Sequence, residues 1–275
     1  MAELLAARMM AALPELRYQP TIKRVRVYLG ADLVVDTTRA VLVWEPMRVV
    51  ASYAVPVDDL LVSPESAPAG PTPEYRPVGF GADSPPLLDP SVPFAVHTAD
   101  GTPLSISSGE RSGAAFRLDD PDLADYAILD FDGYDWLEED EPIVGHARDP
   151  FHRIDVRRSS RQVRIEHEGT LLAESSEGRV LFEGTFPLPR FYLPREDVAA
   201  RLTPGSLKTT CAYKGHATHY DVQAGDDVLP NMAWSYEEPL DDATPVRGLV
   251  SFYQERLDVW LDGEKVERVR TPWST

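Results

Sequence analysis

The residues best suited to chemistry lie between about residues 210 and 240. The first of them, Cys211, is the only cysteine of the chain, and Lys214 follows three residues later. A thiol near a cation can act as a nucleophile, and a lysine can hold an anionic group or act as a base. We therefore predict a site here, with Lys214, Cys211 and Glu237 as candidate catalytic residues. The candidate ligand-binding residues are Tyr213, Gly215, His216, His219, Tyr220, Trp234, Tyr236, Glu183 and Tyr192.

Cys211 and Lys214 also have structural interpretations. Cys211 could be a small buried side chain, as free cysteines usually are. If the segment were one strand, alternation would place Cys211 and Lys214 on opposite faces. Lys214 could form an ion pair with Glu237 or Glu183 that bridges two strands, because a buried charge requires a partner. The two interpretations therefore differ in whether these side chains converge around a hollow.

The aromatic and histidine residues leave similar alternatives. Trp234 and Tyr236 alternate along a predicted strand, so they could form a flat wall for a planar ligand or pack in the core. Cys211, His216 and His219 could offer three metal ligands, but the paired cysteines of zinc folds are absent. We predict no metal site, and the sequence does not identify a cofactor.

The composition limits the class of partner. The 275 residues include 27 basic and 45 acidic ones, so the net charge of −18 repels nucleic-acid phosphates and anionic membranes. One cysteine excludes an internal disulfide framework. No apolar run is long enough to span a bilayer. We expect a soluble, cytoplasmic protein whose partner is a small polar metabolite, with no nucleic-acid or membrane partner; the oligomeric state is not predicted.

An internal repeat organises the chain. The spacing from Glu45 to Pro56 equals the spacing from Glu183 to Pro194, and similar β-branched runs precede both glutamates. These runs alternate apolar and polar residues or are short and β-branched, which is typical of strands in antiparallel hairpins. Glu45 thus recurs as Glu183 at the end of an apolar strand.

We predict a mainly β fold with two tandem, related, compact antiparallel β domains. A short N-terminal helix lies within residues 1–18 and ends before a proline. The first, degenerate β domain covers residues 19–147 and contains a long Pro-rich loop at 62–93, which cannot supply central strands. The second β domain covers residues 148–275 and carries the full set of motifs. A short helix is also expected at residues 195–202.

Three motifs of the second half resemble a known family. They are Cys-x-Tyr-Lys-Gly from Cys211, Trp-Ser-Tyr-Glu from Trp234, and Val-Trp-Leu-Asp-Gly from Val259. With them, the chain resembles a tandem protein of the bacterial domain-of-unknown-function 427 family over about residues 22–60 and 125–275. The resemblance implies compact all-β domains and a nucleotidyltransferase-like label, without an established reaction. Because the first copy lacks these motifs, only the second is expected to carry the full site.

From these residues we predict a protein that handles a small molecule and could be an enzyme, with a polar-aromatic pocket in the second domain. The reaction is not identified. One alternative is a non-catalytic protein-interaction module, and another is a nucleotidyltransferase-like enzyme. The sequence has no Gly-rich phosphate-binding loop to support the last. Convergence of Lys214 with Glu183 or Glu237 would favour the first interpretation.

Overall fold

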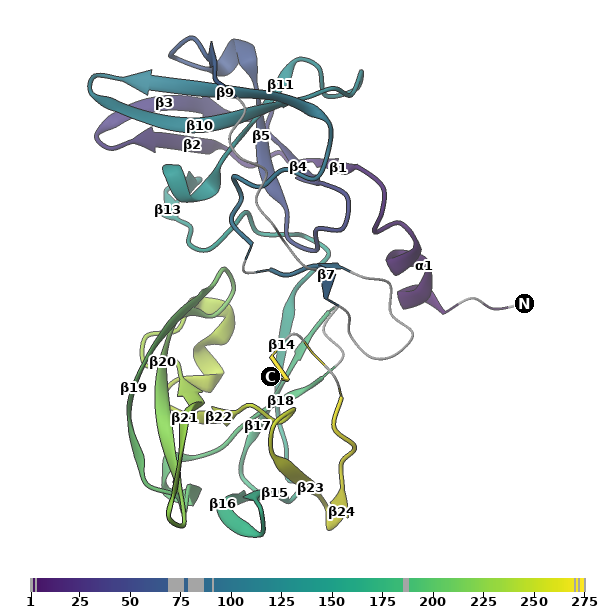
Figure 1. Cartoon of the computed structure of the whole chain (residues 1–275), viewed down its shortest axis with the longest axis vertical. Helices are drawn as coiled ribbons and strands as arrows, with labels where there is room; N and C mark the ends of the chain where they lie inside the picture. Colours follow the sequence, from purple (N-terminus) through teal and green to yellow (C-terminus); the bar gives the residue numbers. More distant parts are fainter. Residues whose placement is uncertain are drawn as a thin grey trace. The chain divides into compact units, whose positions relative to one another are not determined.

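The structure of the protein is a computed structural model, and the residues described are 2, 4–68, 77–78, 87–90, 92–184, 188–269, 271 and 273–274. Short strands in antiparallel sheets dominate it (Figure 1), which confirms the mainly β fold. Much of the predicted Pro-rich loop lies outside the described residues. Within the described residues, no helix has the length and apolar character that crossing a membrane requires.

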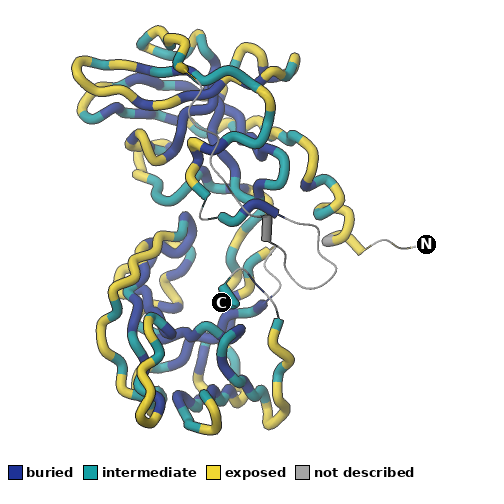
Figure 2. Tube along the Cα trace, viewed as in Figure 1, coloured by how far each residue is buried: buried dark blue, intermediate teal, exposed yellow. Residues whose placement is uncertain are grey.

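The chain divides into two compact units. The first contains Met1–Val78 and Pro85–Asp149, and the second contains Gly79–Ser84 and Pro150–Thr275. Each has its own hydrophobic core, and buried stretches follow the strands of both (Figure 2). The N-terminal helix, α1, covers Leu5–Ala11. The expected helix at 195–202 is shorter, a single 3-10 turn at Arg195–Asp197.

The first unit contains two larger sheets in its described residues. The seven-stranded sheet has the order β1 (Arg17–Pro20), β4 (Val41–Trp44), β5 (Ser52–Pro56), β11 (Tyr126–Leu129), β10 (Arg111–Leu118), β9 (Gly101–Ser108) and β6 (Glu65–Ser66). The four-stranded sheet has the order β13 (Glu141–Pro142), β12 (Asp135–Glu138), β2 (Val25–Leu29) and β3 (Asp32–Thr37). A short pair joins β7 (Pro77–Val78) to β8 (Leu87–Leu88). Alternation explains β2, whose Val25, Val27 and Leu29 face the core.

The described part of the second unit contains three sheets. The first has the order β14 (Ile154–Arg158), β17 (Arg179–Glu183) and β18 (Arg190–Tyr192). The second has the order β19 (Leu202–Cys211), β20 (Gly215–Ala224), β21 (Asp227–Ser235) and β22 (Val250–Phe252). The third has the order β16 (Thr170–Ser175), β15 (Val163–His167), β23 (Asp258–Leu261) and β24 (Glu264–Lys265). Leu193 and Val250 exchange two backbone hydrogen bonds of 2.8 and 2.9 Å. This bridge continues the first of these sheets into the second.

The strand order of the two units corresponds. Joined through the bridge, the second unit has the order β14-β17-β18-β22-β21-β20-β19, which matches β1-β4-β5-β11-β10-β9-β6 of the first. Likewise, β24-β23-β15-β16 matches β13-β12-β2-β3. The pairing register shifts at Val27 in β2 and at the corresponding Ile165 in β15. Positions in the two units can therefore be compared strand by strand.

Candidate functional site

The turn between β19 and β20 contains the lysine of the predicted site. Cys211 ends β19 and pairs with Gly215, which begins β20, so residues 212–214 form the turn. The segment is therefore not one extended strand, and the alternation that would place Cys211 and Lys214 on opposite faces does not apply here. Gly215 has a φ of 90°, a conformation that favours glycine. Cys211 is half-buried, and its charge is among the causes that raise the pKa of Lys214.

Lys214 forms a buried ion pair with Glu183, which lies at the end of β17. The ammonium donates a hydrogen bond to Glu183 Oε1, and Lys214 is only 8% exposed. Burial raises the pKa of Glu183, but Lys214 and His152 more than offset this and bring it to about 2. Burial likewise lowers the pKa of Lys214, yet the surrounding Cys211 and Glu183 hold it well above its usual value. Both partners are therefore charged at neutral pH.

His152 joins this pair from the segment that precedes β14. Its Nε2 lies 3.5 Å from Glu183 Oε2, and its ring centroid lies 5.3 Å from that of Tyr213. Arg153 places its guanidinium 5.6 Å from the Tyr213 ring centre and pairs with Asp242 at 2.5 Å. Our sequence prediction omitted His152, because it lies in the segment that connects the two predicted domains. One carboxylate, Glu183, thus lies between two basic side chains.

Three of the predicted aromatic residues lie next to the ion pair. Trp234 Nε1 donates to Tyr192 Oη at 3.2 Å, and the ring centroids of Tyr192 and Tyr236 are 6.5 Å apart. All three are buried in one cluster, and Tyr192 and Tyr236 both interact electrostatically with Lys214. Burial raises the pKa of Tyr192 to about 12, so its hydroxyl stays protonated. We call the set Glu183, Lys214, His152, Tyr192 and Tyr236 the lysine cluster.

Glu237 belongs to a different group. Its Oε1 accepts hydrogen bonds from Ser235 Oγ at 2.6 Å and from Tyr220 Oη at 3.1 Å. Arg195 completes the group, since its Nη2 lies 3.1 Å from the same oxygen. The Glu237 side chain is 53% exposed. The structure therefore separates Glu237 and Tyr220 from Lys214, although all three were predicted for one site.

The two predicted histidines also lie apart from the lysine cluster. His216 is exposed and forms a hydrogen bond of 2.9 Å with Thr210, while His219 is buried and forms one of 2.8 Å with Thr209. Neither forms a three-ligand group with Cys211. Among the described residues, the group with ligand atoms close enough to share a metal ion is His167, Glu168 and Asp227, within 4.8 Å of one another. The last two are exposed.

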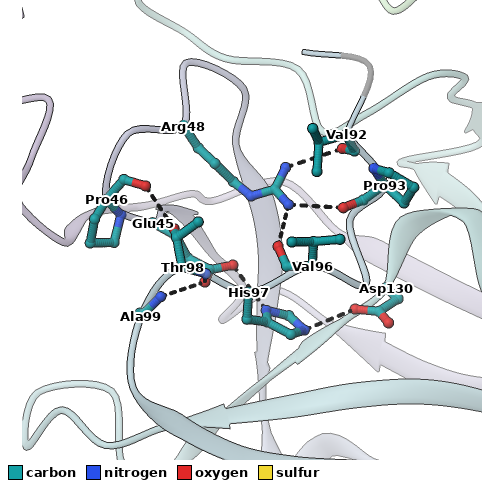
Figure 3. Close-up of polar contacts among 10 residues, drawn as sticks. All are labelled: Glu45, Pro46, Arg48, Val92, Pro93, Val96, His97, Thr98, Ala99 and Asp130. Carbon is teal, nitrogen blue, oxygen red and sulfur yellow. Dashed lines mark hydrogen bonds and ion pairs between the residues drawn. The ribbon is translucent and has the colours of Figure 1, made fainter. Parts of the chain in front are cut away.

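The first unit has an ionic group around Glu45, the counterpart of Glu183 (Figure 3). His97 Nδ1 lies 3.0 Å from Glu45 Oε1, and the amides of Thr98 and Ala99 donate to Oε2 at 2.7 and 3.1 Å. On its other side, His97 Nε2 lies 3.3 Å from Asp130 Oδ1. Sequence reasoning missed this group because the first copy lacks the motifs. The recurrence of Glu45 was the available signal.

Comparison with known proteins gives a family match within the second unit. A search among curated proteins gives no match. Residues 155–263 match the family model described as "Domain of unknown function (DUF427)". The matched segment extends from β14 to β23 and contains Glu183, Lys214 and Trp234, but not His152.

Proposed function

We propose that the second unit binds a small polar molecule at the lysine cluster, and that Lys214 holds an oxygen of this molecule. The observation that carries the proposal is a buried ammonium with spare hydrogen-bonding capacity. An ammonium has three N–H donors, and in the described structure Lys214 uses one of them, toward Glu183. A buried donor without a partner is costly, so water or a ligand is expected at the other two.

The charge state of Lys214 defines the role that we assign to it. A lysine acts as a general base or forms a Schiff base only when its amine is neutral. Cys211 and Glu183 instead keep the pKa of Lys214 well above its usual value. We therefore assign Lys214 the role of an electrostatic holder for a carbonyl, carboxylate or phosphate oxygen. Tyr192 and Tyr236 offer hydroxyl groups and ring faces beside it.

Cys211 is the residue that could make this site catalytic in addition to binding a ligand. Cys211 is half-buried, whereas Lys214 and Tyr236 are buried, so it is the most exposed residue of the three. A cysteine acts as a nucleophile through its thiolate form. We propose Cys211 as the candidate nucleophile and Lys214 as the residue that orients the substrate beside it.

Thermal-shift screening against a library of small anionic and carbonyl compounds tests the proposal. Three proteins are compared: the wild type, Lys214→Met, and Lys208→Met as a control at an exposed lysine of β19. A compound present at a hundredfold excess over its Kd stabilises the folded state by about 2.7 kcal/mol. We expect at least one compound to shift the wild type and Lys208→Met but not Lys214→Met. Equal shifts in all three proteins would exclude Lys214 as the holder, and a screen without hits would favour the interaction module.

A further inference from the structure

We infer that the first unit contains a binding site for a planar cation, and that the side chain of His97 occupies this site as an internal ligand. The inference rests on the geometry around His97 and is independent of the function proposed for the second unit. It changes the interpretation of the first unit, which the absence of motifs had suggested to be a degenerate copy.

The walls of the site are two carboxylates and an aromatic face. Glu45 and Asp130 lie 3.0 and 3.3 Å from the two ring nitrogens of His97, on opposite edges of the ring. The ring of Phe116 stacks on the imidazole, with centroids 3.8 Å apart and planes 7° from parallel. Acids at both edges and an aromatic ring against one face match the shape and charge of a flat cation.

The ring is charged in this environment. Burial lowers the pKa of His97, but the interactions with Asp130 and Glu45, which include a hydrogen bond with Glu45, outweigh it and raise the pKa to about 9. Glu45 comes from the end of β4, Asp130 follows β11, and the third wall, Phe116 of β10, carries no charge. The guanidinium of Arg48 also lies in this region (Figure 3).

Arg48 fixes the segment that carries His97. It is fully buried, and its Nη2 donates to the carbonyl oxygen of Pro93 at 2.9 Å and to that of Val96. Its guanidinium also lies 5.5 Å from the ring centre of Phe94. The residues before His97 are therefore attached to Arg48, while His97 itself is attached to the two acids. The ring is preorganised in its site, as an internal ligand requires.

The strand register relates this site to the second unit. Glu45 corresponds to Glu183 and Phe116 corresponds to Trp234. The same registers make Gly101, the first residue of β9, correspond to Ala217 of β20. His97 and Tyr213 each lie four residues before these positions, so they also correspond. A histidine ring in the first unit thus takes the place of the Tyr213 ring. Glu45 is bonded by a side chain and backbone amides of its own unit, whereas Glu183 pairs with a lysine that has N–H donors to spare.

Deletion of the ring and replacement by a free one tests the inference. His97→Gly leaves a space shaped for imidazole between Glu45 and Asp130. We expect the variant to unfold at a lower temperature than the wild type. Near pH 6, where free imidazole is mostly protonated, imidazole at a hundredfold excess over its Kd should raise its Tm by about 5 °C. The neutral ring 1,2,4-triazole, which has the same shape, should have no such effect.

Two controls keep the test decisive. His216→Gly removes an exposed histidine of the second unit and should gain nothing from imidazole. If His97→Gly does not fold, NMR titration of His97 in the wild-type chain replaces it, with an expected midpoint near 9. The inference is overturned if imidazole and triazole act alike on a folded His97→Gly, or if the titration midpoint is no higher than the usual value of about 6.5.

Discussion

The two units place opposite arrangements of charge at corresponding positions. In the second unit, the carboxylate of Glu183 lies between two basic side chains, Lys214 and His152. In the first unit, the imidazolium of His97 lies between two carboxylates, Glu45 and Asp130. The acid at the end of the strand is common to both, and its partners differ. The same framework can therefore present a site that favours an anion or one that favours a cation.

The two units also differ in which groups occupy the carboxylate oxygens of the shared acid. Both oxygens of Glu45 are occupied, by a ring nitrogen and by two backbone amides. Backbone amides cannot leave without unfolding the segment, and the ring of His97 occupies the other oxygen, so this group is closed to outside ligands while that ring is in place. Glu183 instead contacts two side chains, and its lysine keeps donors for another molecule. A buried acid is thus a shared structural element, and we propose that the side-chain donors around it decide whether a unit can take a ligand.

The largest effect is expected when the shared acid is neutralised in the second unit. Glu183→Gln leaves the ammonium of Lys214 buried without its counter-charge, and breaking a buried pair in this way costs about 3–5 kcal/mol of the free energy of unfolding. Adding Lys214→Met to Glu183→Gln should recover most of this loss, because the unpaired charge is then gone. Denaturant unfolding of the two single variants and the double variant measures the coupling between the residues.

The same substitution at a surface glutamate distinguishes the effect of losing a buried charge from the effect of losing any charge. Glu174→Gln removes a partially exposed acid that pairs with Arg164 at 3.0 Å in the same unit. We expect a loss below about 1 kcal/mol there, as for other exposed pairs. A similarly small loss for Glu183→Gln would mean that the pair with Lys214 does not hold the turn.

The sequence predicts the framework of this comparison well. Alternation in segments such as Val25–Leu29 identifies the strands, because one face of each strand packs on a core. Equal spacing after Glu45 and Glu183 aligns the two copies, and the observed registers agree with it. The requirement that a buried lysine have a partner names Glu183 as a candidate for Lys214. Choosing it over Glu237 needs the structure, since both are compatible with the pattern.

The remainder depends on contacts that no local pattern records. Cys211 and Lys214 interact because a turn interrupts the strand between them, and alternation gives no sign of where extended backbone ends. His152 and Asp130 reach their partners from segments outside the repeated runs. His97 lies 52 residues from Glu45, so only the fold brings them together. Sequence reasoning therefore located Glu45, Glu183 and the lysine and tyrosines around Glu183, but it missed His152 and the partners of Glu45.

The next effect is a pH dependence of opposite direction in the two units. His97 has a folded pKa of about 9, above its usual 6.5, so its contribution is complete below about pH 6.5 and is lost as the pH rises through 9. Glu183 has a folded pKa of about 2, below its usual 4.5, so its contribution is present above about pH 4.5 and is lost as the pH falls through 2. Each shift corresponds to about 3 kcal/mol.

Fluorine NMR of 5-fluorotryptophan protein can follow the two units separately. Trp136 lies in the core of the first unit and Trp234 in a buried cluster of the second. Between about pH 7 and 10, the denaturation midpoint reported by Trp136 should fall, and His97→Gln should remove this pH dependence. In acid, the midpoint reported by Trp234 should fall, and Glu183→Gln should remove that dependence. An alkaline loss unchanged by His97→Gln would place the titrating group elsewhere.

The smallest effect is expected at Glu237, which is the one candidate catalytic residue that the structure separates from Lys214. Hydrogen bonds from Ser235 and Tyr220 and the charge of Arg195 lower the pKa of this carboxyl, but about half of its side chain faces solvent. Glu237→Gln keeps an oxygen that can accept the bonds from Ser235 and Tyr220, so we expect a stability change within about 1 kcal/mol. Compounds that shift the wild type should shift this variant equally, in contrast to Lys214→Met. If these compounds no longer shifted Glu237→Gln, then Glu237 and the lysine cluster would belong to one ligand site, contrary to the separation described above.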